Sequence, residues 1–285
     1  MKLVVISGVS GSGKSTALHV LEDQDYYCID NLPVGLLPDF SDKMRAFPGQ
    51  LGNLAAVGID ARNPALDLSR FPEIIDSLKQ AGVDVEVIYL DADDDILLKR
   101  FSETRRKHPL SSEKTPLYEA IHHERRLLQP IIDRADLFLD TTHRNVHQLR
   151  DLISERIRGK RGGSLSILFE SFGFKHGIAT DADFVFDARC LPNPHWETQL
   201  RALTGRDRAV AEFLEGQPLV NEYFEQISAM LASWIPAFEA DNRSYLTIAI
   251  GCTGGQHRSV YLIERLGQYF RDQRDHVIIR HRDLP

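Results

Sequence analysis

The residues with the clearest chemical meaning form an octapeptide near the start of the chain, Gly8-Val9-Ser10-Gly11-Ser12-Gly13-Lys14-Ser15. Its glycines permit a tight turn in which successive backbone N–H groups point inward and hold an anion. Lys14 supplies a cation for the outer phosphates, and the Ser15 hydroxyl supplies an oxygen ligand for Mg²⁺. The pattern follows the apolar run Leu3 to Ile6 and opens a helical stretch. It therefore predicts a site for the phosphates of ATP or GTP together with Mg²⁺.

Two acidic residues follow later apolar runs and are candidates for the metal side of this site. Asp60 follows the run Ala55 to Ile59, and Asp30 follows Tyr27 to Ile29. Carboxylates just past strand ends gather at the carboxyl edge of a parallel sheet, where ligands bind. Asp60 is the preferred carboxylate for Mg²⁺, and Asp30 is second, as a metal-side carboxylate or a base near the γ-phosphate. Either carboxylate could instead cap the turn that follows its strand.

Basic residues of the N-terminal half suggest how the phosphates would be enclosed. Arg62 and Asn63 follow Asp60 and would reach the same edge of the sheet. A cluster of four basic residues, Arg100, Arg105, Arg106 and Lys107, is suited to closing over negative charge, although a solvated helix face is an alternative. Hydrolysis of the nucleotide would rest on Lys14 and Ser15, with help from Asp60 or Asp30. A small-molecule kinase, the alternative function, would use the P-loop for ATP and the segment Arg100 to Lys107 as a lid.

A second anion-binding pattern lies near the C-terminus, in Gly251-Cys252-Thr253-Gly254-Gly255-Gln256-His257-Arg258-Ser259. Glycines, a helix N-terminus, hydroxyls and the guanidinium of Arg258 would all donate to a phosphate. The spacing from Cys252 to Arg258 also matches the loop of cysteine-dependent phosphatases, in which a thiolate attacks phosphorus. Of the two interpretations, non-catalytic phosphate binding is preferred, because nothing in the sequence places a general acid beside Cys252. Three further polar residues, His176, Asp187 and His195, could complete a sugar-phosphate site.

The distribution of apolar residues predicts two α/β domains in the 285 residues. Short apolar runs alternate with helical stretches over residues 1–156, which is typical of a P-loop domain with a parallel sheet. Residues 157–164 are basic and glycine-rich and are interpreted as a linker. Strand and helix patterns resume in residues 165–285, which predicts a second, smaller α/β domain. The predicted strands there are Leu165 to Phe169, Phe184 to Phe186, Leu246 to Ile250 and Val277 to Ile279.

Composition excludes several classes of protein. The net charge of −7 argues against a surface that binds nucleic acid throughout, so RNA contacts would be local. Two local candidates exist, the linker and a basic C-terminal run that includes Arg280 and Arg282, with solvated charge as the alternative. Three widely spaced cysteines favour neither a disulfide framework nor a zinc site and indicate a cytoplasmic protein. No apolar stretch suits a signal peptide or a membrane span, so no membrane partner is expected.

Over its whole length the chain resembles the RapZ (YvcJ-like) P-loop nucleotide-binding proteins, whose enteric members are RNase adapters. The resemblance rests on the two glycine-rich motifs above and on Asp30-Asn31-Leu32-Pro33, Asp60-Ala61-Arg62-Asn63, Ser171-Phe172-Gly173-Phe174-Lys175-His176-Gly177, Asp187-Ala188-Arg189 and Pro192-Asn193-Pro194-His195. It implies a kinase-like P-loop domain with ATPase and GTPase activity, in which Asp60 to Asn63 is the second nucleotide-contacting motif. It also implies a regulatory role, exerted by a homo-oligomer.

For the C-terminal domain, the resemblance implies sensing of glucosamine-6-phosphate and binding of small RNAs, one of which adapter members present to an endoribonuclease to control amino-sugar synthesis. By motif position the sugar phosphate would contact His176, Asp187, His195, Cys252, Thr253, Gly254, Gly255 and Arg258. The C-terminus departs from the adapter pattern. Adapter members carry a strongly basic tail, whereas this chain ends Arg280-His281-Arg282-Asp283-Leu284-Pro285. The difference predicts either a shortened chain or a weaker RNA role.

Overall fold

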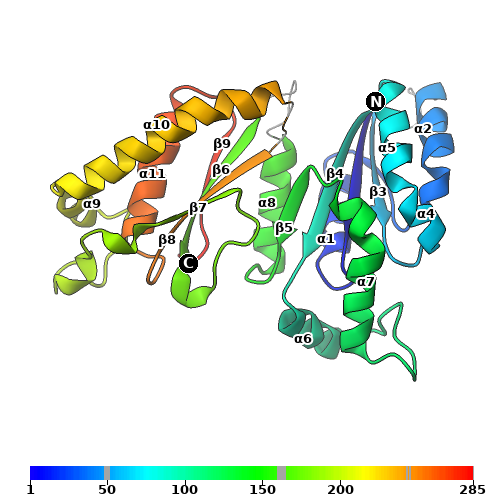
Figure 1. Ribbon diagram of the computed structural model, residues 1–285, viewed down its shortest axis with the longest axis horizontal. Coiled ribbons are helices and arrows are strands. Elements are labelled where there is room, and N and C mark those ends of the chain that lie inside the picture. The colour runs from blue at the N-terminus through cyan, green and yellow to red at the C-terminus, as the bar shows by residue number, and fades with distance from the viewer. Residues whose placement is uncertain (48–51, 159–164, 242, 244, 285) are drawn as a thin grey trace. The chain divides into compact units, whose positions relative to one another are not determined.

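The computed structural model describes residues 1–47, 52–158, 165–241, 243 and 245–284. The chain divides into two compact units, Met1–Ser154 and Glu155–Pro285, shown in Figure 1. Most of the predicted linker, residues 159–164, lies outside the described residues. Its first two residues are not linker, because helix α8 continues through Ile157 and Arg158.

The N-terminal unit alternates strands with helices, as the pattern of apolar runs predicts. Its elements are β1 (Lys2–Gly8), α1 (Lys14–Glu22), β2 (Tyr27–Ile29), η1 (Val34–Leu36), α2 (Leu37–Ala46), β3 (Leu54–Ile59), α4 (Ala65–Ser69), α5 (Phe71–Gln80), β4 (Asp84–Asp91), α6 (Asp94–Thr104), α7 (Leu117–Ile132), β5 (Leu137–Asp140) and α8 (Val146–Arg158). The strands form one sheet in the order β2-β3-β1-β4-β5, and every neighbouring pair is parallel. The expected parallel-sheet α/β fold is confirmed.

Both faces of this sheet are buried, which explains why its strands are apolar runs rather than alternating patterns. Leu3 and Val5 of β1 belong to one core cluster with residues of α2, α5 and α7. Their neighbours Val4 and Ile6 point to the opposite face and are also fully buried. Helix α1 packs against β1, β2 and β3. The sheet is thus a rigid layer whose carboxyl edge can hold a site.

The C-terminal unit is a second parallel α/β domain with its own core. Its elements after α8 are β6 (Ser166–Gly173), η2 (Phe174–His176), β7 (Phe184–Asp187), η3 (Ala188–Cys190), η4 (Pro194–Trp196), α9 (Arg208–Glu215), α10 (Pro218–Ala240), β8 (Tyr245–Cys252), α11 (Arg258–Arg271) and β9 (Val277–His281). The sheet order is β7-β8-β6-β9, again with parallel neighbours. A separate apolar cluster, which includes Phe169, Leu231, Ile248 and Leu262, fills its interior.

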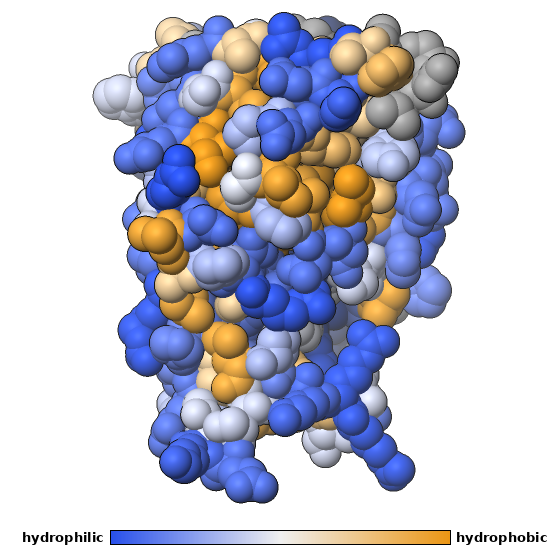
Figure 2. All heavy atoms as spheres, turned by 90° about the vertical axis from the view of Figure 1, so that its right-hand side faces the viewer, coloured by the Kyte–Doolittle hydropathy of each residue, from blue (hydrophilic) through white to orange (hydrophobic). Residues whose placement is uncertain are grey.

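The surface of the N-terminal unit is mixed in character. Figure 2 shows the face that lies on the right in Figure 1, where hydrophobic side chains are visible among hydrophilic ones. Leu36, Phe47 and Leu66 are large apolar side chains that are exposed on this unit. Among the described residues, no helix combines the length and the apolar character needed to cross a membrane.

Candidate functional site

The P-loop joins β1 to α1 at the point of the sheet where the connections change direction. Strand β1 lies between β3 and β4, so the chain leaves β1 toward one half of the sheet and later returns to build the other half. Crevices that bind ligands form outside the carboxyl ends of strands at such a position. Gly11 and Gly13 adopt the left-handed backbone region, with φ of 90° and 109°, which allows the loop to curl around an anion.

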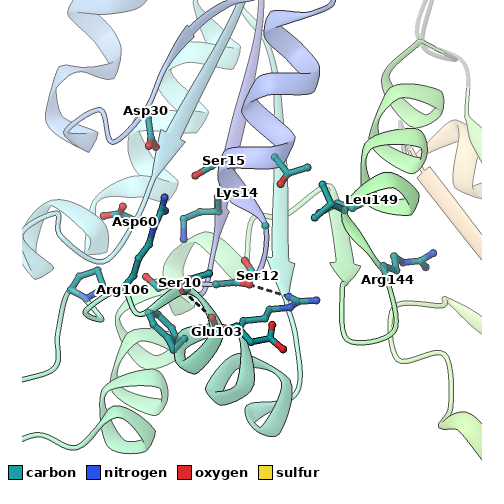
Figure 3. A pocket seen from close by; sticks show the side chains of 18 of the residues that line it. Ser10, Ser12, Lys14, Ser15, Asp30, Asp60, Glu103, Arg106, Arg144 and Leu149 are labelled. Atoms are coloured by element: carbon teal, nitrogen blue, oxygen red, sulfur yellow. Dashed lines mark hydrogen bonds between the residues drawn. The ribbon is translucent and has the colours of Figure 1, made fainter.

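A cavity of about 760 Å³ opens at this loop, a size common for small-ligand sites. It is lined by Ser10, Gly11, Ser12, Gly13, Lys14, Ser15, Thr16, Asp30, Asp60, Arg62, Arg100, Phe101, Glu103, Thr104, Arg106, Lys107, Pro109, Arg144, Asn145, Val146 and Leu149. Figure 3 shows Lys14, Ser15, Asp30 and Asp60 on one side of the cavity, with Arg144 and Leu149 opposite them. The residues predicted from separate stretches of sequence therefore line one cavity.

Lys14 is half-buried, and its Nζ donates to the carbonyl oxygen of Gly8 at 2.6 Å. Burial lowers the pKa of Lys14, while the nearby carboxylates of Glu124, Asp60 and Asp30 act against that shift. The Ser12 hydroxyl in the same loop is buried without a hydrogen-bond partner in the described part of the chain. Buried polar groups are normally satisfied, so an unpartnered hydroxyl beside a half-buried lysine fits a loop that accepts a phosphate.

The two predicted carboxylates differ in their surroundings. Asp60 is buried and accepts from Nε and Nη2 of Arg62, at 3.0 and 2.6 Å to Oδ2. Burial raises the pKa of Asp60, but the hydrogen bonds from Arg62 and the charge of Lys14 outweigh it and lower that pKa. Asp30 is exposed at the cavity. The carboxylate of Asp60, which the sequence favours as the Mg²⁺ ligand, is thus already bonded to Arg62, whereas the carboxylate of Asp30 is exposed to solvent in the cavity.

The residues around Asp60 also hold the edge of the sheet in place. Asn63 is buried, accepts from the backbone N–H of Val34 at 2.7 Å and donates to the Asp60 carbonyl at 3.2 Å. Ala61 is buried as well. Neither residue lines the cavity. Of the predicted motif Asp60 to Asn63, only Asp60 and Arg62 therefore face the site.

Oxygen ligands suited to Mg²⁺ are present at the P-loop. The Ser15 hydroxyl and the carboxylates of Asp30 and Asp60 line the same cavity. Mg²⁺ in phosphate sites is held by one or two carboxylates together with phosphate oxygens and water. The described residues contain no group of three or more His, Cys, Asp or Glu side chains arranged to hold a metal by themselves. The donor set thus fits a metal ion that arrives with a phosphate ligand.

The predicted basic cluster separates into two roles. Arg100 donates to the Gly11 carbonyl at 3.0 Å and to the Thr141 carbonyl at 2.7 Å, so it links the P-loop to the residues after β5. Arg106 and Lys107 are exposed, line the cavity and belong to the segment between α6 and α7. These two cations, rather than Arg100, are placed to meet negative charge.

Sequence reasoning missed two buried residues beside the P-loop, Glu124 and His108. Glu124 accepts from the backbone N–H and the hydroxyl of Ser10, both at 2.8 Å, and lies 2.8 Å from Nε2 of His108. A signal was present in the sequence, because Glu124 stands at a core position of α7 in the series Ile121, Glu124, Leu128. An acidic residue on the apolar face of a helix needs a buried partner.

The second predicted site lies at the carboxyl edge of the C-terminal sheet. The strand register sets Gly173 beside Cys252 and Asp187 beside Gly251, so three strands end at the same place. A Cβ at Gly173 would lie 2.6 Å from the backbone carbon of Gly254. The end of β6 and the glycine-rich loop are therefore in close contact, and only glycine fits there.

The side chains of this loop are held more firmly than the sequence suggests. The Sγ of Cys252 lies 3.2 Å from the Ser259 hydroxyl, and Cys252 is 3% exposed. Arg258 is buried and donates to the carbonyl oxygens of Arg189 at 3.1 Å and Leu191 at 3.0 Å. Its Nη2 also lies 3.4 Å from the Thr253 hydroxyl. The guanidinium of Arg258 thus braces the loop against the segment after β7.

The other predicted sugar-phosphate residues surround this loop on the surface. His176 and His195 are exposed, and the His195 ring lies 6.3 Å from that of His257. Asp187 accepts from Arg189 at 2.7 Å. Hydrogen bonds from Arg189, which outweigh burial, lower the pKa of Asp187. These residues border one edge of the sheet, and Asp187 is already paired with a cation.

The two arginines predicted to contact RNA are paired within the C-terminal unit. Arg280 forms an ion pair with Glu155 at 2.7 Å. Arg282 donates to the carbonyl oxygens of Gly177 and Ile178, and its guanidinium lies 5.1 Å from the centre of the Phe172 ring. Contact with RNA through Arg282 would compete with these bonds.

Comparison with known proteins places the whole chain. Residues 1–161 match the RapZ-like N-terminal domain, and residues 165–285 match the RapZ C-terminal domain. A "Nucleotide-binding protein" of Nitrosococcus oceani is 57% identical over 100% of both chains. A "Nucleotide-binding protein" of Marinobacter nauticus is 54% identical over 100% of this chain and 97% of the relative.

Among solved structures, shikimate kinase from Bacteroides thetaiotaomicron is similar with a TM-score of 0.36 and 13% identity, covering 55% of this chain and 96% of that one. A gluconokinase from Sinorhizobium meliloti has a TM-score of 0.34 and 16% identity, covering 53% of this chain and 89% of that one. The assignment rests instead on the two domain matches and on the full-length relatives. This chain belongs to the RapZ family of nucleotide-binding proteins.

Proposed function

We propose that this protein is a nucleotide-dependent regulator in which each domain binds a phosphorylated ligand at the carboxyl edge of its own sheet. The N-terminal domain binds ATP or GTP with Mg²⁺ at Gly8 to Ser15 and hydrolyses it slowly. The C-terminal domain binds a phosphosugar such as glucosamine-6-phosphate. The observation that carries the proposal is the pair of glycine-rich strand-to-helix loops, one in each sheet.

The chemistry at the first loop follows from its donors. The loop N–H groups and Lys14 bind the phosphates, and the helix N-terminus of α1 adds positive potential. Mg²⁺, when bound, neutralises phosphate charge, and Ser15 with Asp30 or Asp60 would hold it. Because Arg62 already engages Asp60, Asp30 is the carboxylate better placed to orient an attacking water. Arg106 and Lys107 balance the charge that develops during transfer.

Exchange of the P-loop lysine tests the nucleotide site. Lys14→Ala removes a half-buried cation from the phosphates, and we expect affinity for Mg·ATP and Mg·GTP to fall about 100-fold. Lys99→Ala is the matched control, because Lys99 lies on α6 of the same domain and its side chain is 71% exposed. Isothermal titration calorimetry measures both variants. Unchanged affinity in Lys14→Ala would remove the assignment of this loop.

The C-terminal proposal is supported by the convergence of Cys252, Thr253 and the loop glycines beside His176 and His195. Glucosamine-6-phosphate should bind the full-length protein measurably, whereas glucosamine without phosphate should not, because the loop recognises the phosphate. Thr253→Val removes one hydroxyl donor and should weaken binding about fivefold to tenfold. Arg208→Ala, at a side chain 92% exposed on α9, is the control. Equal binding of both sugars would argue against a phosphate cradle.

The regulatory output that we propose is binding of a small structured RNA and its delivery to an endoribonuclease, by a cytoplasmic homo-oligomer. Membership of the family supports this proposal. Because Arg280 and Arg282 are each already bonded to other groups of the protein, we expect the surface that contacts RNA to be small. Filter binding over a salt series should show tighter binding to structured small RNA than to random RNA of equal length. Equal affinity for the two RNAs would contradict the proposed binding of small structured RNA, and would not affect the proposals for the nucleotide and phosphosugar sites.

Two enzymatic functions compete with this proposal. A small-molecule kinase is favoured by the cations Arg106 and Lys107 at the cavity, and an acceptor substrate should then raise nucleotide turnover far above the basal rate. A Cys252 phosphatase is disfavoured by geometry, because Arg258 is committed to backbone carbonyls. A phosphatase also needs a general acid, and Asp183, one acidic residue upstream of the loop, already accepts from Arg243 and from the backbone N–H of Thr247. Absence of p-nitrophenyl phosphate turnover would eliminate the phosphatase.

A further inference from the structure

A chain of hydrogen bonds connects the P-loop to the segment that carries the exposed cations Arg106 and Lys107. We define this relay as Ser10, Glu124 and His108. Glu124 on α7 accepts two bonds from Ser10 and one from His108. The side chains of Glu124 and His108 are both 0% exposed. The relay therefore joins two segments far apart in sequence through a carboxylate that water does not reach.

The direction of the hydrogen bond between His108 and Glu124 follows from a backbone contact of His108. The N–H of Leu110 donates to Nδ1 of His108 at 3.1 Å. An Nδ1 that accepts a hydrogen bond carries no proton, so in this arrangement the ring is neutral and its single proton is on Nε2. His108 thus donates to Glu124. The Glu124 carboxylate accepts from all three of these donors, and an ionised carboxylate is the form that only accepts.

The charge of Glu124 agrees with this arrangement. Burial raises the pKa of Glu124, but the His108 bond, the charge of Lys14 and the two Ser10 bonds outweigh it and lower that pKa. A carboxylate with its acceptor positions occupied and no solvent access is a poor base for an attacking water. Its geometry suits holding other groups in place instead.

The segment held by His108 carries the cations of the cavity. Arg106 and Lys107 directly precede His108 and line the same cavity as Ser10, and Figure 3 labels Ser10 and Arg106 there. The His108 ring also packs against Phe101 of α6, with ring centres 5.3 Å apart. His108 is held by Glu124 on one side and by Phe101 on the other. Its position therefore restricts the conformations that the backbone of residues 106 and 107 can adopt.

We propose that Glu124 is a positioning residue, which ties Ser10 of the P-loop to His108 so that Arg106 and Lys107 are set over the phosphates of the bound nucleotide. The proposal deepens the nucleotide-site assignment and rests on it. Glu124 itself touches no phosphate. Glu124 acts through Ser10 and His108, which it holds by hydrogen bonds. Its effect is to fix the position of the two cations relative to the P-loop.

The test uses Glu124→Gln in the full-length protein. Glutamine has the same shape, but it replaces one acceptor oxygen by an NH₂ group, which donates. The three donors, two from Ser10 and one from His108, then meet a single acceptor oxygen, so at least one relay bond is lost. Trypsin cleaves after Arg105, Arg106 and Lys107, and without nucleotide we expect cleavage there to become roughly threefold faster or more, because the segment opens more often. Glu119→Gln is the control, since Glu119 is exposed on the same helix and should leave the rate unchanged.

A double-mutant cycle separates positioning from general loosening of the fold. Arg106→Ala with Lys107→Ala should weaken Mg·ATP binding about threefold to tenfold. If Glu124 acts through these cations, adding Glu124→Gln to the double variant should weaken binding little further. Full additivity would overturn the proposal, as would an unchanged trypsin rate in Glu124→Gln.

Two arrangements keep the test decisive. If Glu124→Gln does not fold, His108→Ala removes the contacts of the His108 ring with Glu124 and Phe101 and leaves Ser10 paired with Glu124, and the same two readouts apply. The trypsin measurement needs no nucleotide. A parent protein that binds no nucleotide would therefore refute the proposed function, whereas equal cleavage of parent and variant would refute the relay.

Discussion

At the scale of single residues, Cys252 and Cys28 show how opposite surroundings change one chemical group. Burial raises the pKa of Cys252, but the Ser259 hydroxyl and the backbone N–H groups of Ser259, Gly255 and His257 outweigh it and lower that pKa. Burial raises the pKa of Cys28 to about 11, and no donor counters it. The thiolate is the reactive form, so the two cysteines should respond differently to pH.

We predict that alkylation by iodoacetamide follows this order. As pH falls from 9 to 6, Cys252 should remain a thiolate, and so continue to react, at pH values below the ordinary thiol pKa of about 8.5. Cys28 should react only at much higher pH. Peptide mass spectrometry measures the rate at each cysteine, with the exposed Cys190 as the reference within the chain. A Cys252 midpoint at or above the ordinary thiol pKa of about 8.5 would contradict the assignment. Inorganic phosphate should slow Cys252 if an anion shares its donors.

Gly8 gives a second prediction at this scale. A Cβ at Gly8 would lie 2.1 Å from the carbonyl oxygen of Leu90, in the backbone of the neighbouring strand, and its φ is 150°. Gly8→Ala should therefore force β1 away from β4 and lower the free energy of unfolding by about 3 kcal/mol or more. Gly35→Ala is the control, since nothing lies within 4 Å of its added Cβ. Urea unfolding of both variants decides, and equal midpoints would show that the contact is relieved.

At the scale of elements, local patterns predicted the helices and strands well. The apolar run Tyr27 to Ile29 matches β2 residue for residue, and the predicted strand Phe184 to Phe186 lies within β7, because short apolar runs bounded by polar residues are typical of strands. The position of the P-loop between β1 and α1 was predictable for the same reason. Its phosphate-facing residues lie within a few positions of one another.

The contacts that complete the sites were not predictable in this way. Glu124 meets Ser10 across 114 positions of sequence, and no local pattern encodes such a pairing. The pairing of Arg62 with Asp60 and of Arg258 with backbone carbonyls depends likewise on rotamers and tertiary packing. Sequence therefore indicated which residues gather at each sheet edge, while the structure showed which of them are free to meet a ligand.

The segment after β9 provides a prediction at this scale. Arg282 joins this segment to residues 173–178 through carbonyl oxygens, and its side chain is 6% exposed. Arg282→Ala should lower the free energy of unfolding of the C-terminal domain by about 1–3 kcal/mol. Arg280→Ala should cost less than about 1 kcal/mol, because its partner Glu155 is 48% exposed. Urea unfolding followed by the tryptophans, Trp196 and Trp234, both in the C-terminal unit, measures the two. The reverse order would mean that Arg282 is not structural.

At the scale of the whole molecule, the two units have separate hydrophobic cores. The main N-terminal cluster contains residues such as Leu3, Val57 and Tyr89, and the main C-terminal cluster contains residues such as Phe169 and Leu262. A ligand that binds only the folded form of one unit stabilises that unit by mass action. Because each unit holds its own glycine-rich loop, each ligand should stabilise a different part of the chain.

We therefore predict two thermal transitions in differential scanning calorimetry of the full-length protein. Mg·ATP at about 100 times its dissociation constant should stabilise the N-terminal unit by about 2.7 kcal/mol and raise its midpoint by about 5–10 °C. Glucosamine-6-phosphate should raise only the other midpoint. Because Lys14→Ala is expected to bind about 100-fold more weakly, it should cut the first stabilisation to about 0.4 kcal/mol and preserve the second. Thr253→Val should preserve the first shift and reduce the second. A single transition that both ligands raise equally would instead mean that the domains unfold as one cooperative unit, and the two ligands would then affect each other's binding through that shared stability.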